Sequence, residues 1–485
     1  MSPHDDPQRW KALAVLGVAY LMVVLDVSIV NVALPSIQKD LNFAPENLQW
    51  VISGYALTFG GFLLLGGRVG DLLGRRWLFM VGLGAFAVFS LACGLATSEG
   101  MLIAFRALQG LAGAILSPSV FSIVSVTFRE GSERNKALGI LGAIAGSGAA
   151  IGVLAGGVLT QYAGWEWIFF VNVPIGVGAL FFVPRFVRES RADDMTRHFD
   201  TAGAFTVTAS LMLLVYGLTQ STNVGWASAR TIGVLIGSVI LMAGFIVIEK
   251  RSRSPLVPLG FFRRRTPTGA NVIGFGLGTM VFGMFFLLSL YMQQVLGFSA
   301  LKTGVGYLAV ALTAVAASGA AQALVTRLGV KPVLITGLLL LGAGQLYFTQ
   351  VSVNGSYVSD LLPGFLLIGV GLGFSFVPVS IAALAGVTGR DAGLASGLIN
   401  TSQQIGGALG LAILTTIATT KTDHLLTAGE QRAQAFTSGY SLAFWAGVGF
   451  AVLSAVATVL VLKREDLVQA GAEPAGAKPA GAEAG

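Results

Sequence analysis

The feature that most constrains this chain is a succession of fourteen apolar runs, each of about 18 residues or more. A helix of that length crosses the hydrocarbon core of a bilayer, which is about 30 Å thick. The runs are continuous, which excludes the alternating pattern of an outer-membrane barrel. Only 11% of the side chains are charged, so 485 residues could not form the polar surface of a soluble multidomain enzyme. We therefore predict an all-α polytopic membrane protein with spans at 12–35, 48–66, 77–96, 100–126, 137–161, 166–187, 200–219, 230–248, 269–292, 303–325, 333–350, 361–385, 393–419 and 438–462.

The distribution of Lys and Arg predicts how these spans are oriented, because cytoplasmic connections are enriched in basic residues. With the N-terminus inside, 24 of the 30 basic residues lie in cytoplasmic segments, five lie outside, and Arg106 lies within a span. Both termini are then cytoplasmic, in a multi-pass protein of the cell inner (plasma) membrane. Topology explains the net charge of +7, so we expect no nucleic-acid partner.

The two ends of the chain and three longer connections complete this outline. Residues 1–11 form a short cytoplasmic N-terminus, and the first span is too long for a signal-peptide core. Residues 463–485 end in repeated Ala-Gly-Ala with Glu, Lys and Pro, which predicts a disordered cytoplasmic tail. The longer connections are Arg185–Phe199, Lys250–Thr268 and Thr420–Thr437.

A faint internal repeat divides the spans into two sets of six. The loop at 73–78 recurs at 328–333, and a pattern of Ile and Gly at 151–156 recurs at 405–410, with offsets of 255 and 254. Such repeats are typical of transporters whose substrate site lies between the halves. We predict a six-helix half at 12–187, a linker with two extra transmembrane helices at 188–268, and a second six-helix half at 269–462.

Asp26 is the one carboxylate deep inside a predicted span, and Arg106 lies in another span at a matching depth. Asp26 follows Lys11 by 15 residues, or about 22 Å of helix, and Arg106 lies about 10 Å below Glu99 at the outer surface. An unpaired charge at that depth is too unfavourable to face lipid. Two interpretations remain open: a structural ion pair, or a proton-binding carboxylate held by an arginine.

The loop between the second and third spans contains Gly67, Asp71, Gly74, Arg75 and Arg76. It is either a tight turn that obeys the charge bias of cytoplasmic loops or a cytoplasmic gate. In the second interpretation Asp71 pairs with basic groups of a neighbouring span and holds the inner side shut in one state.

Glycines in the fifth span predict a close helix contact. Gly148, Gly152 and Gly156 recur every four residues and share one face, and Gly157 follows directly. Small residues at this spacing let two backbones approach each other. This packing is sufficient to explain the pattern, and a role in sealing against proton leak is a further hypothesis.

Amide side chains within the spans are candidates for the substrate cavity. Asn400, Gln403 and Gln404 share a face of the thirteenth span, Gln109 lies one turn from Arg106, and Asn31 follows Asp26 in the first span. Amides also hold helices together through hydrogen bonds, and both roles remain open.

We expect neither an enzyme nor a cofactor. The three histidines lie in tails or loops, Cys93 is the single cysteine, and no metal-ligand spacing, nucleophile–base pair or Walker motif is found. Metal binding and ATP-driven transport are therefore not expected.

Taken together, these motifs resemble those of a fourteen-span drug:proton antiporter of the major facilitator superfamily, the EmrB/QacA type. The resemblance extends from Lys11 to about Arg464. The matching segments are the first-span run Leu25–Pro35, the loop glycines and arginines at 67–76, the fourth-span Arg106, Gln109 and Gly110, the fifth-span glycines, and Trp165–Pro174. Val153 stands where the fifth-span motif usually has proline.

The resemblance implies a major facilitator fold and a secondary active exporter. Such a protein exchanges cytoplasmic amphipathic compounds for external protons by alternating access, with Asp26 and Arg106 in proton coupling. Its partners would be the small-molecule substrate, protons and the lipid bilayer, and it would act as a monomer. The alternatives are a proton-coupled or passive importer on the same fold and a membrane sensor that no longer transports.

Overall fold

The computed structural model describes residues 8–129, 132–190, 200–252, 255–257, 259–385 and 392–462, so most of the predicted N-terminal segment and the whole predicted tail lie outside the described residues. Within the described part the chain is helical and contains no strand. The helices are α1 (Arg9–Asp40), α2 (Trp50–Leu73), α3 (Arg75–Gly94), α4 (Glu99–Thr127), α5 (Ser132–Tyr162), α6 (Trp167–Phe170), α7 (Asn172–Phe186), α8 (Thr201–Val224), α9 (Ala229–Arg251), η2 (Leu259–Arg263), α10 (Arg265–Leu290), η3 (Tyr291–Val295), α11 (Ala300–Leu328), α12 (Val330–Phe348), η4 (Tyr357–Leu361), α13 (Leu362–Leu384), α14 (Ala392–Thr427) and α15 (Arg432–Val461).

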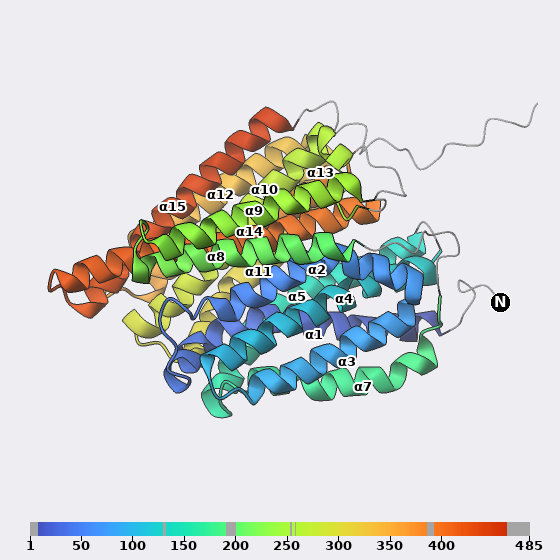
Figure 1. Ribbon diagram of the computed structural model, residues 1–485, viewed down its shortest axis with the longest axis horizontal. Helices are drawn as coiled ribbons and strands as arrows, with labels where there is room; N and C mark the ends of the chain where they lie inside the picture. The colour runs from blue at the N-terminus through green and yellow to red at the C-terminus, as the bar shows by residue number, and fades with distance from the viewer. Residues whose placement is uncertain are drawn as a thin grey trace, which may run out of the picture.

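The predicted helical membrane fold is confirmed. Thirteen segments of the described chain are long and apolar enough to cross a membrane, with α6 and α7 forming one of them. The apolar part of α5, Ala150–Tyr162, falls short of that length, but the whole helix is as long as its neighbours and lies among them (Figure 1). Each of the fourteen predicted runs thus corresponds to one helix or to a continuous helix pair.

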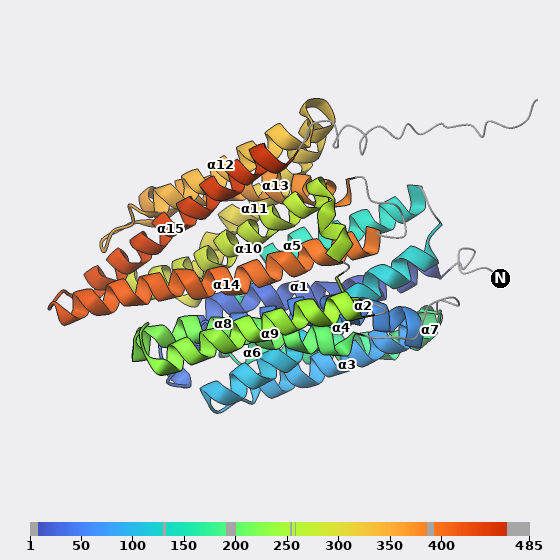
Figure 2. The same ribbon diagram turned by 45° about the horizontal axis from the view of Figure 1, so that its top comes forward.

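The predicted connection Thr420–Thr437 is largely wrong. Helix α14 continues to Thr427 and α15 begins at Arg432, so only a short turn separates them. Hydropathy marks the part of a helix that lies in lipid, and a helix that continues into water beyond it keeps its backbone hydrogen bonds. The α14–α15 hairpin accordingly extends past the ends of its neighbours (Figures 1 and 2).

Polar caps and glycines set the helix ends. Ser98, Ser228 and Ser299 each accept a hydrogen bond from the backbone N–H three residues later, which satisfies one of the free donors of the first turn. Gly74 separates α2 from α3 with φ of 121°, a conformation that side-chain-bearing residues rarely adopt.

The two groups α1–α7 and α10–α15 have the same packing pattern. In the first group α1 packs on α5, α2 on α4, and α3 on both α4 and α7. In the second, α10 packs on α14, α11 on α13, and α12 on both α13 and α15. The pairs correspond one to one, so each group repeats one six-helix arrangement.

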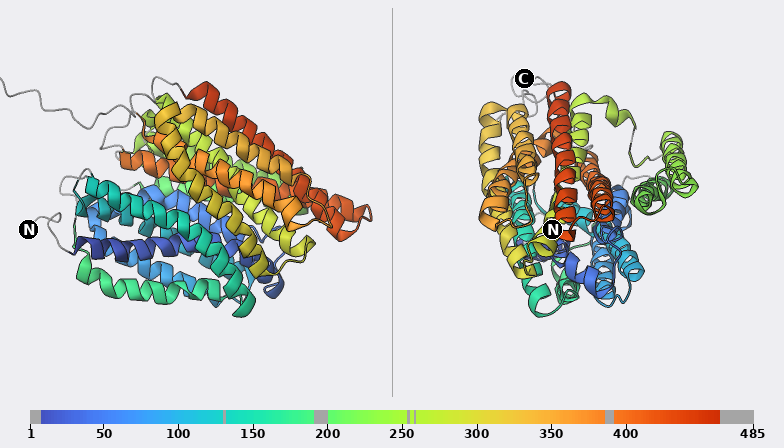
Figure 3. Two further views of the ribbon diagram at one scale, coloured as in Figure 1. Left: turned by 180° about the vertical axis from the view of Figure 1, so that it is seen from behind. Right: turned by 90° about the vertical axis from the view of Figure 1, so that its left-hand side faces the viewer.

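The two groups approach each other most closely at the end of the bundle opposite to the chain termini. We call the end where α1 begins and α15 ends the terminal end, and the opposite one the far end. There, Ser289 of α10 donates a hydrogen bond of 2.6 Å to the backbone oxygen of Asn31 in α1. Gln294 of η3 donates to Gln38 of α1 at 2.8 Å. Toward the terminal end a gap opens between the ribbons of the two groups (Figures 1 and 3), but α2 and the first turns of α14 remain in contact through Leu64, Ala395 and Leu398.

Helices α8 and α9 pack on each other, and α8 lies along the seam where α2 meets α14. A small apolar cluster joins the three helices, including Leu57 of α2, Leu211 of α8 and Ala408 of α14. Most of α9 stays on the outside of the bundle (Figure 2). The extra pair therefore contacts both groups mainly through α8, and Met242 of α9 packs against the same apolar cluster.

Candidate proton-coupling and gating sites

Asp26 and Arg106 form an ion pair in the interior of the first helix group. Asp26 is fully buried in α1, Arg106 is 2% exposed in α4, and Arg106 Nη1 lies 2.6 Å from Asp26 Oδ2. The two side chains that we expected at matching depth are thus in direct contact. The two charges stabilise each other, because either one alone would be buried without an opposite charge to compensate it.

Two amides complete the surroundings of the carboxylate. Gln109 of α4 and Asn172 of α7 both donate to Asp26 Oδ1, at 2.8 Å and 3.1 Å. Both amides also donate to the hydroxyl of Ser90 in α3, which itself donates to the backbone oxygen of Phe169. The carboxylate therefore has three side-chain donors from two helices, all in the part of the bundle that excludes solvent.

Arg106 keeps partners that do not depend on Asp26. Its Nε donates to the backbone oxygen of Val51 in α2 at 2.9 Å, and its Nη1 also donates to Gln109 Oε1 at 2.6 Å. The guanidinium lies over the ring of Tyr55, 4.4 Å from its centroid, and 5.6 Å from that of Phe169. The arginine can therefore stay in place while the carboxylate changes its charge.

The sequence indicated three members of this cluster and missed three. Asp26, Arg106 and Gln109 were singled out, whereas Ser90 was not, and Asn172 was noted only as part of the matching segment Trp165–Pro174 and not as a site residue. Tyr55 was also missed. Asn172 carried a usable signal, since it is an amide within an apolar span, the same criterion that selected Asn400. Two roles were left open for Gln109, lining a cavity and holding helices together. It lies inside the cluster, one turn from Arg106, and hydrogen-bonds to α1 and α3.

Three glycines of α5 bring its backbone against α1. A Cβ added at Gly156 would lie 2.6 Å from the backbone oxygen of Ile29, and one at Gly148 would lie 2.9 Å from a methyl of Val24. A Cβ at Gly152 would overlap the hydroxyl of Ser28. Because real Cβ atoms essentially never come that close, this face of α5 accepts glycine alone without displacement.

Gly157 lies on another face and contacts the second helix group. Its added Cβ would lie 2.9 Å from the backbone oxygen of Ala300 in α11, and one at Gly304 would overlap the backbone oxygen of Val153. Gly157 and Gly304 thus allow α5 and α11 to touch at the far end. The glycine series serves two contacts, one within the first group and one between the groups.

The loop predicted as a gate is anchored within the first group. Gly67 and Asp71 belong to α2, and an added Cβ at Gly67 would meet Pro118 of α4 at 3.5 Å. The side chain of Asp71 lies outside the described residues, so the pairing expected of it has no structural account.

Arg75 and Arg76 bind partners of the same group. Arg75 Nε donates to Ser122 of α4 at 2.7 Å. Glu189, just after α7, accepts from the backbone N–H of Arg76 at 3.1 Å, and it lies 3.9 Å from Arg76 Nε. A carboxylate at this position stabilises the start of α3, whose first N–H groups have no partner within the helix. Glu189 was not identified from the sequence.

The remaining amides occupy different surroundings. Asn400 of α14 is exposed. On one side of it Gln404 lies against Gly60 of α2, and on the other Gln403 lies against Gly274 of α10. By helix geometry Asn400 therefore points between the two groups. Asn31 is partly buried and donates to Val27 of its own helix at 3.1 Å, so its side chain is satisfied locally.

Among the residues that the structure describes, no group of three or more His, Cys, Asp and Glu side chains could hold a metal ion.

Comparisons with known proteins agree on one family. The profile of the Major Facilitator Superfamily matches residues 16–411. The chain is 38% identical to the puromycin resistance protein of Streptomyces alboniger, over 95% of this chain and 93% of that one. It is also 38% identical to the cephamycin export protein of Amycolatopsis lactamdurans, over 84% of each.

Solved structures show the same fold at low identity. A bacterial homolog of the human lysosomal transporter Spinster, in an inward-facing and unoccupied conformation, superimposes with a TM-score of 0.70 at 14% identity and covers 96% of this chain and 99% of its own. The transporter PepTSo of the POT family gives 0.69 at 13% identity, over 95% and 99%. From its helical membrane fold, its family profile and its close relatives, the chain belongs to the Major Facilitator Superfamily of membrane transporters.

Proposed function

We propose that this protein exports amphipathic, antibiotic-like compounds from the cytoplasm in exchange for external protons, with Asp26 as the proton carrier. The observation that carries the proposal is the buried pair of Asp26 and Arg106, in which the arginine has further partners of its own. Protonation of Asp26 would remove one charge, and Val51, Gln109 and the Tyr55 ring would still hold the guanidinium.

Helix α1 is the element through which proton binding would reach the rest of the molecule. Asp26 lies five residues before Asn31, whose backbone oxygen takes part in the far-end contact with Ser289, and that distance is about 7.5 Å along a helix. Between them, Ser28 and Ile29 pack against the glycines of α5. A change in the pairing of Asp26 would therefore shift a helix that carries both a close internal contact and the seal at the far end.

The transport cycle follows from this arrangement. In the state described here the two groups are hydrogen-bonded at the far end, and the carboxyl group of Asp26 is enclosed by Arg106, Gln109 and Asn172. Opening of the far end would admit external water, and proton uptake by Asp26 would weaken its hold on α4. The substrate would leave on that side, and the return to the closed state would release the proton to the cytoplasm.

The direction of transport is supported by the relatives, which are named for export of or resistance to antibiotics. We propose that both termini lie in the cytoplasm and the far end outside, and the distribution of basic residues supports this orientation. Asn400, exposed between the groups, is our candidate for substrate contact, with Gln403 and Gln404 beside it. We further propose that the transporter acts as a monomer in the inner membrane.

The test is export in reconstituted vesicles under an imposed pH gradient, with puromycin as the first probe. Protein oriented with its far end toward an acidic compartment should drive the probe into that compartment, and collapse of the gradient with a protonophore should stop it. Asp26→Asn keeps the shape and cannot titrate, so it should abolish the gradient-driven part.

A matched control is Glu249→Gln, which neutralises a buried carboxyl of α9 away from the cluster and should leave gradient-driven export intact. Full gradient-driven export by the Asp26→Asn protein would show that the proton binds elsewhere. Accumulation of the probe in the opposite direction would favour the importer, and absence of every flux would favour the sensor.

A further inference from the structure

One face of α15 changes from apolar to polar at the depth where the lipid hydrocarbon must end. Leu442, Trp445, Val452, Val456 and Val459 are all exposed and recur every three, four or seven residues, so they form one stripe along the helix. From Leu442 to the helix end at position 461 is about 28 Å, close to the thickness of the hydrocarbon core of about 30 Å. Trp445 then lies near the outer boundary, where tryptophan is enriched.

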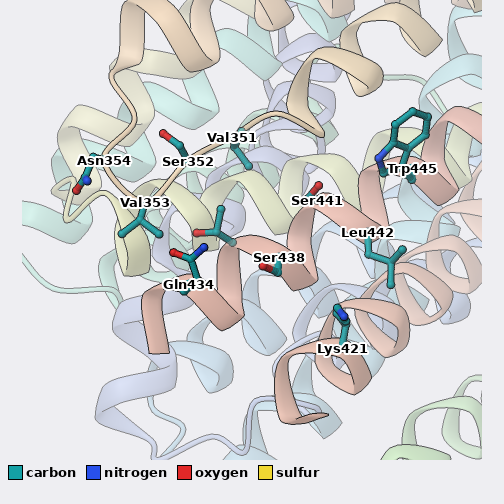
Figure 4. Close-up of a pocket in the computed structure, with 11 residues that line it drawn as sticks. Val351, Ser352, Val353, Asn354, Lys421, Gln434, Ser438, Ser441, Leu442 and Trp445 are labelled. Atoms are coloured by element: carbon teal, nitrogen blue, oxygen red, sulfur yellow. The ribbon is translucent and has the colours of Figure 1, made fainter. Parts of the chain in front are cut away.

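Directly beyond this boundary the same face of α15 lines a pocket of about 590 Å³ (Figure 4). Three parts of the far end meet around it: the loop after α12, the last turns of α14, and the first turns of α15. The lining residues include Ser352 and Asn354 of the loop, Lys421 of α14, and Gln434 and Ser438 of α15. Leu442 and Trp445 line it on the side toward the lipid stripe.

The pocket contains donors that the described part of the protein leaves unused. Lys421 is partly buried, and its ammonium group forms no ion pair or hydrogen bond with any described residue. The side chains of Gln434 and Ser438 likewise have no partner among the described residues, and Figure 4 shows both on one helix of the pocket wall, with Lys421 on another. Asp360 follows the loop after α12, and its carboxylate accepts hydrogen bonds from Ser352 and Ser356, so its partners come from its own segment and do not include Lys421.

We propose that this pocket binds the phosphate headgroup of an anionic phospholipid of the outer leaflet. The Lys421 ammonium would pair with the phosphate, and Gln434 and Ser438 would donate to its other oxygens. Leu442 and Trp445 would contact the glycerol and the first carbons of the acyl chains. The lipid is favoured over a soluble phosphate because the polar pocket continues into an apolar stripe of hydrocarbon length.

The experiment measures lipid retention by the full-length protein purified in detergent, using native mass spectrometry. Equal amounts of phosphatidylglycerol and phosphatidylcholine are added to the wild type and to Lys421→Gln. We expect the wild type to retain more phosphatidylglycerol, and Lys421→Gln to reduce this excess by up to about fivefold, the upper end of the range for a partly exposed ion pair. Lys421→Arg, which keeps the charge, should retain it.

The matched control is Lys302→Gln, which removes another lysine of the far end, one that lies over the ring of Phe298. It should bind phosphatidylglycerol like the wild type. Thermal unfolding gives a second readout and shows that each variant is folded. Addition of phosphatidylglycerol should shift the unfolding midpoint of the wild type and leave that of Lys421→Gln unchanged.

Two results would overturn the proposal. Equal retention of phosphatidylglycerol by the wild type and by Lys421→Gln would show that the lipid does not bind at this pocket. Displacement of phosphatidylglycerol by millimolar sn-glycerol 3-phosphate, with the same dependence on Lys421, would assign the pocket to a soluble phosphate compound. Both readouts are independent of export.

Discussion

The hydroxyl of Thr415 in α14 donates a hydrogen bond of 2.7 Å to the side-chain oxygen of Gln49, the residue that precedes α2. The amide nitrogen of the same Gln49 donates to Thr219 of α8 at 2.8 Å. One buried glutamine thus connects the two six-helix groups and the inserted pair at the far end. Because these two hydrogen bonds join the start of α2 to α14 and to α8, we expect this amide to restrain opening of the far end.

Gln49→Leu should therefore favour opening of the far end while the fold is retained. Both threonines can bond carbonyls of their own helices, at Leu411 and Val215, so the loss in stability should be about 1–2 kcal/mol. A cysteine introduced at Gln38 removes the acceptor of the far-end hydrogen bond from Gln294 in both backgrounds, and it should react with a maleimide faster when Gln49→Leu is also present.

The control for this measurement is Gln161→Leu, which alters an exposed amide of α5 at the far end. The native Cys93 is buried and contributes no background. An unchanged rate in Gln49→Leu would mean that the amide does not restrain opening.

Sequence reasoning located the ion pair because charge inside a membrane is rare, and its depth can be counted along a helix. Asp26 and Arg106 both followed from that count. Ser90 and Tyr55 did not, because a hydroxyl within an apolar run is common and its partner depends on how helices rotate about their axes. The same limit applies to Glu189, whose role depends on the path of the chain after α7.

The fold was accessible for a related reason. A span needs about 20 apolar residues, so its existence can be read from composition alone. The helix ends could not be read in this way, and the extension of α14 to Thr427 shows why: polar helix outside the lipid looks like a loop in a hydropathy profile. The position of α8 in the seam also escaped prediction, since a linker helix carries no signal for which surface it covers.

The orientation can be tested by labelling two exposed basic positions at opposite ends of the bundle. A cysteine at Lys302 should react with a membrane-impermeant maleimide added to intact cells. One at Arg263 should react only after permeabilisation, because we place the terminal end in the cytoplasm. Labelling of Arg263→Cys in intact cells would reverse the orientation and with it the direction assigned to proton flow.

The close contact of α5 with α1 predicts opposite effects of the same substitution at two glycines. Gly156→Ala places a methyl 2.6 Å from a backbone oxygen and should lower stability by about 1–3 kcal/mol. Gly139→Ala, in the same helix, meets no atom within 4 Å and should raise stability by about 0.5–1 kcal/mol, because alanine is the better helix former. Thermal unfolding in detergent measures both, and equal shifts would show that the contact is absent.

Substitution of both members of the ion pair should be less harmful than substitution of one. Asp26→Asn leaves Arg106 buried beside neutral groups, and loss of one partner of a buried pair typically costs about 3–5 kcal/mol. Adding Arg106→Met removes the uncompensated charge, so the double variant should recover part of the stability while remaining unable to couple export to a pH gradient. Additive losses in the thermal unfolding midpoints would indicate that the two charges are independent in the folded protein.

A single proton-binding carboxylate sets how export responds to the membrane potential. Asp26 has no titratable counterpart in the second group, since the position 255 residues later is Val281. One proton should enter for each substrate that leaves, so export of a neutral compound would be electrogenic and export of a monovalent cation electroneutral. Dications should be poor substrates, because one carboxylate beside an arginine cannot balance two charges in a low-dielectric site.

The measurement uses vesicles in which potassium and valinomycin set the membrane potential at a constant pH gradient. Neutral-substrate export should accelerate when the potential favours positive charge moving inward, and export of a monovalent cation should not change. If the monovalent cation also responds, more than one proton moves in each cycle, and a second carrier must exist beside Asp26.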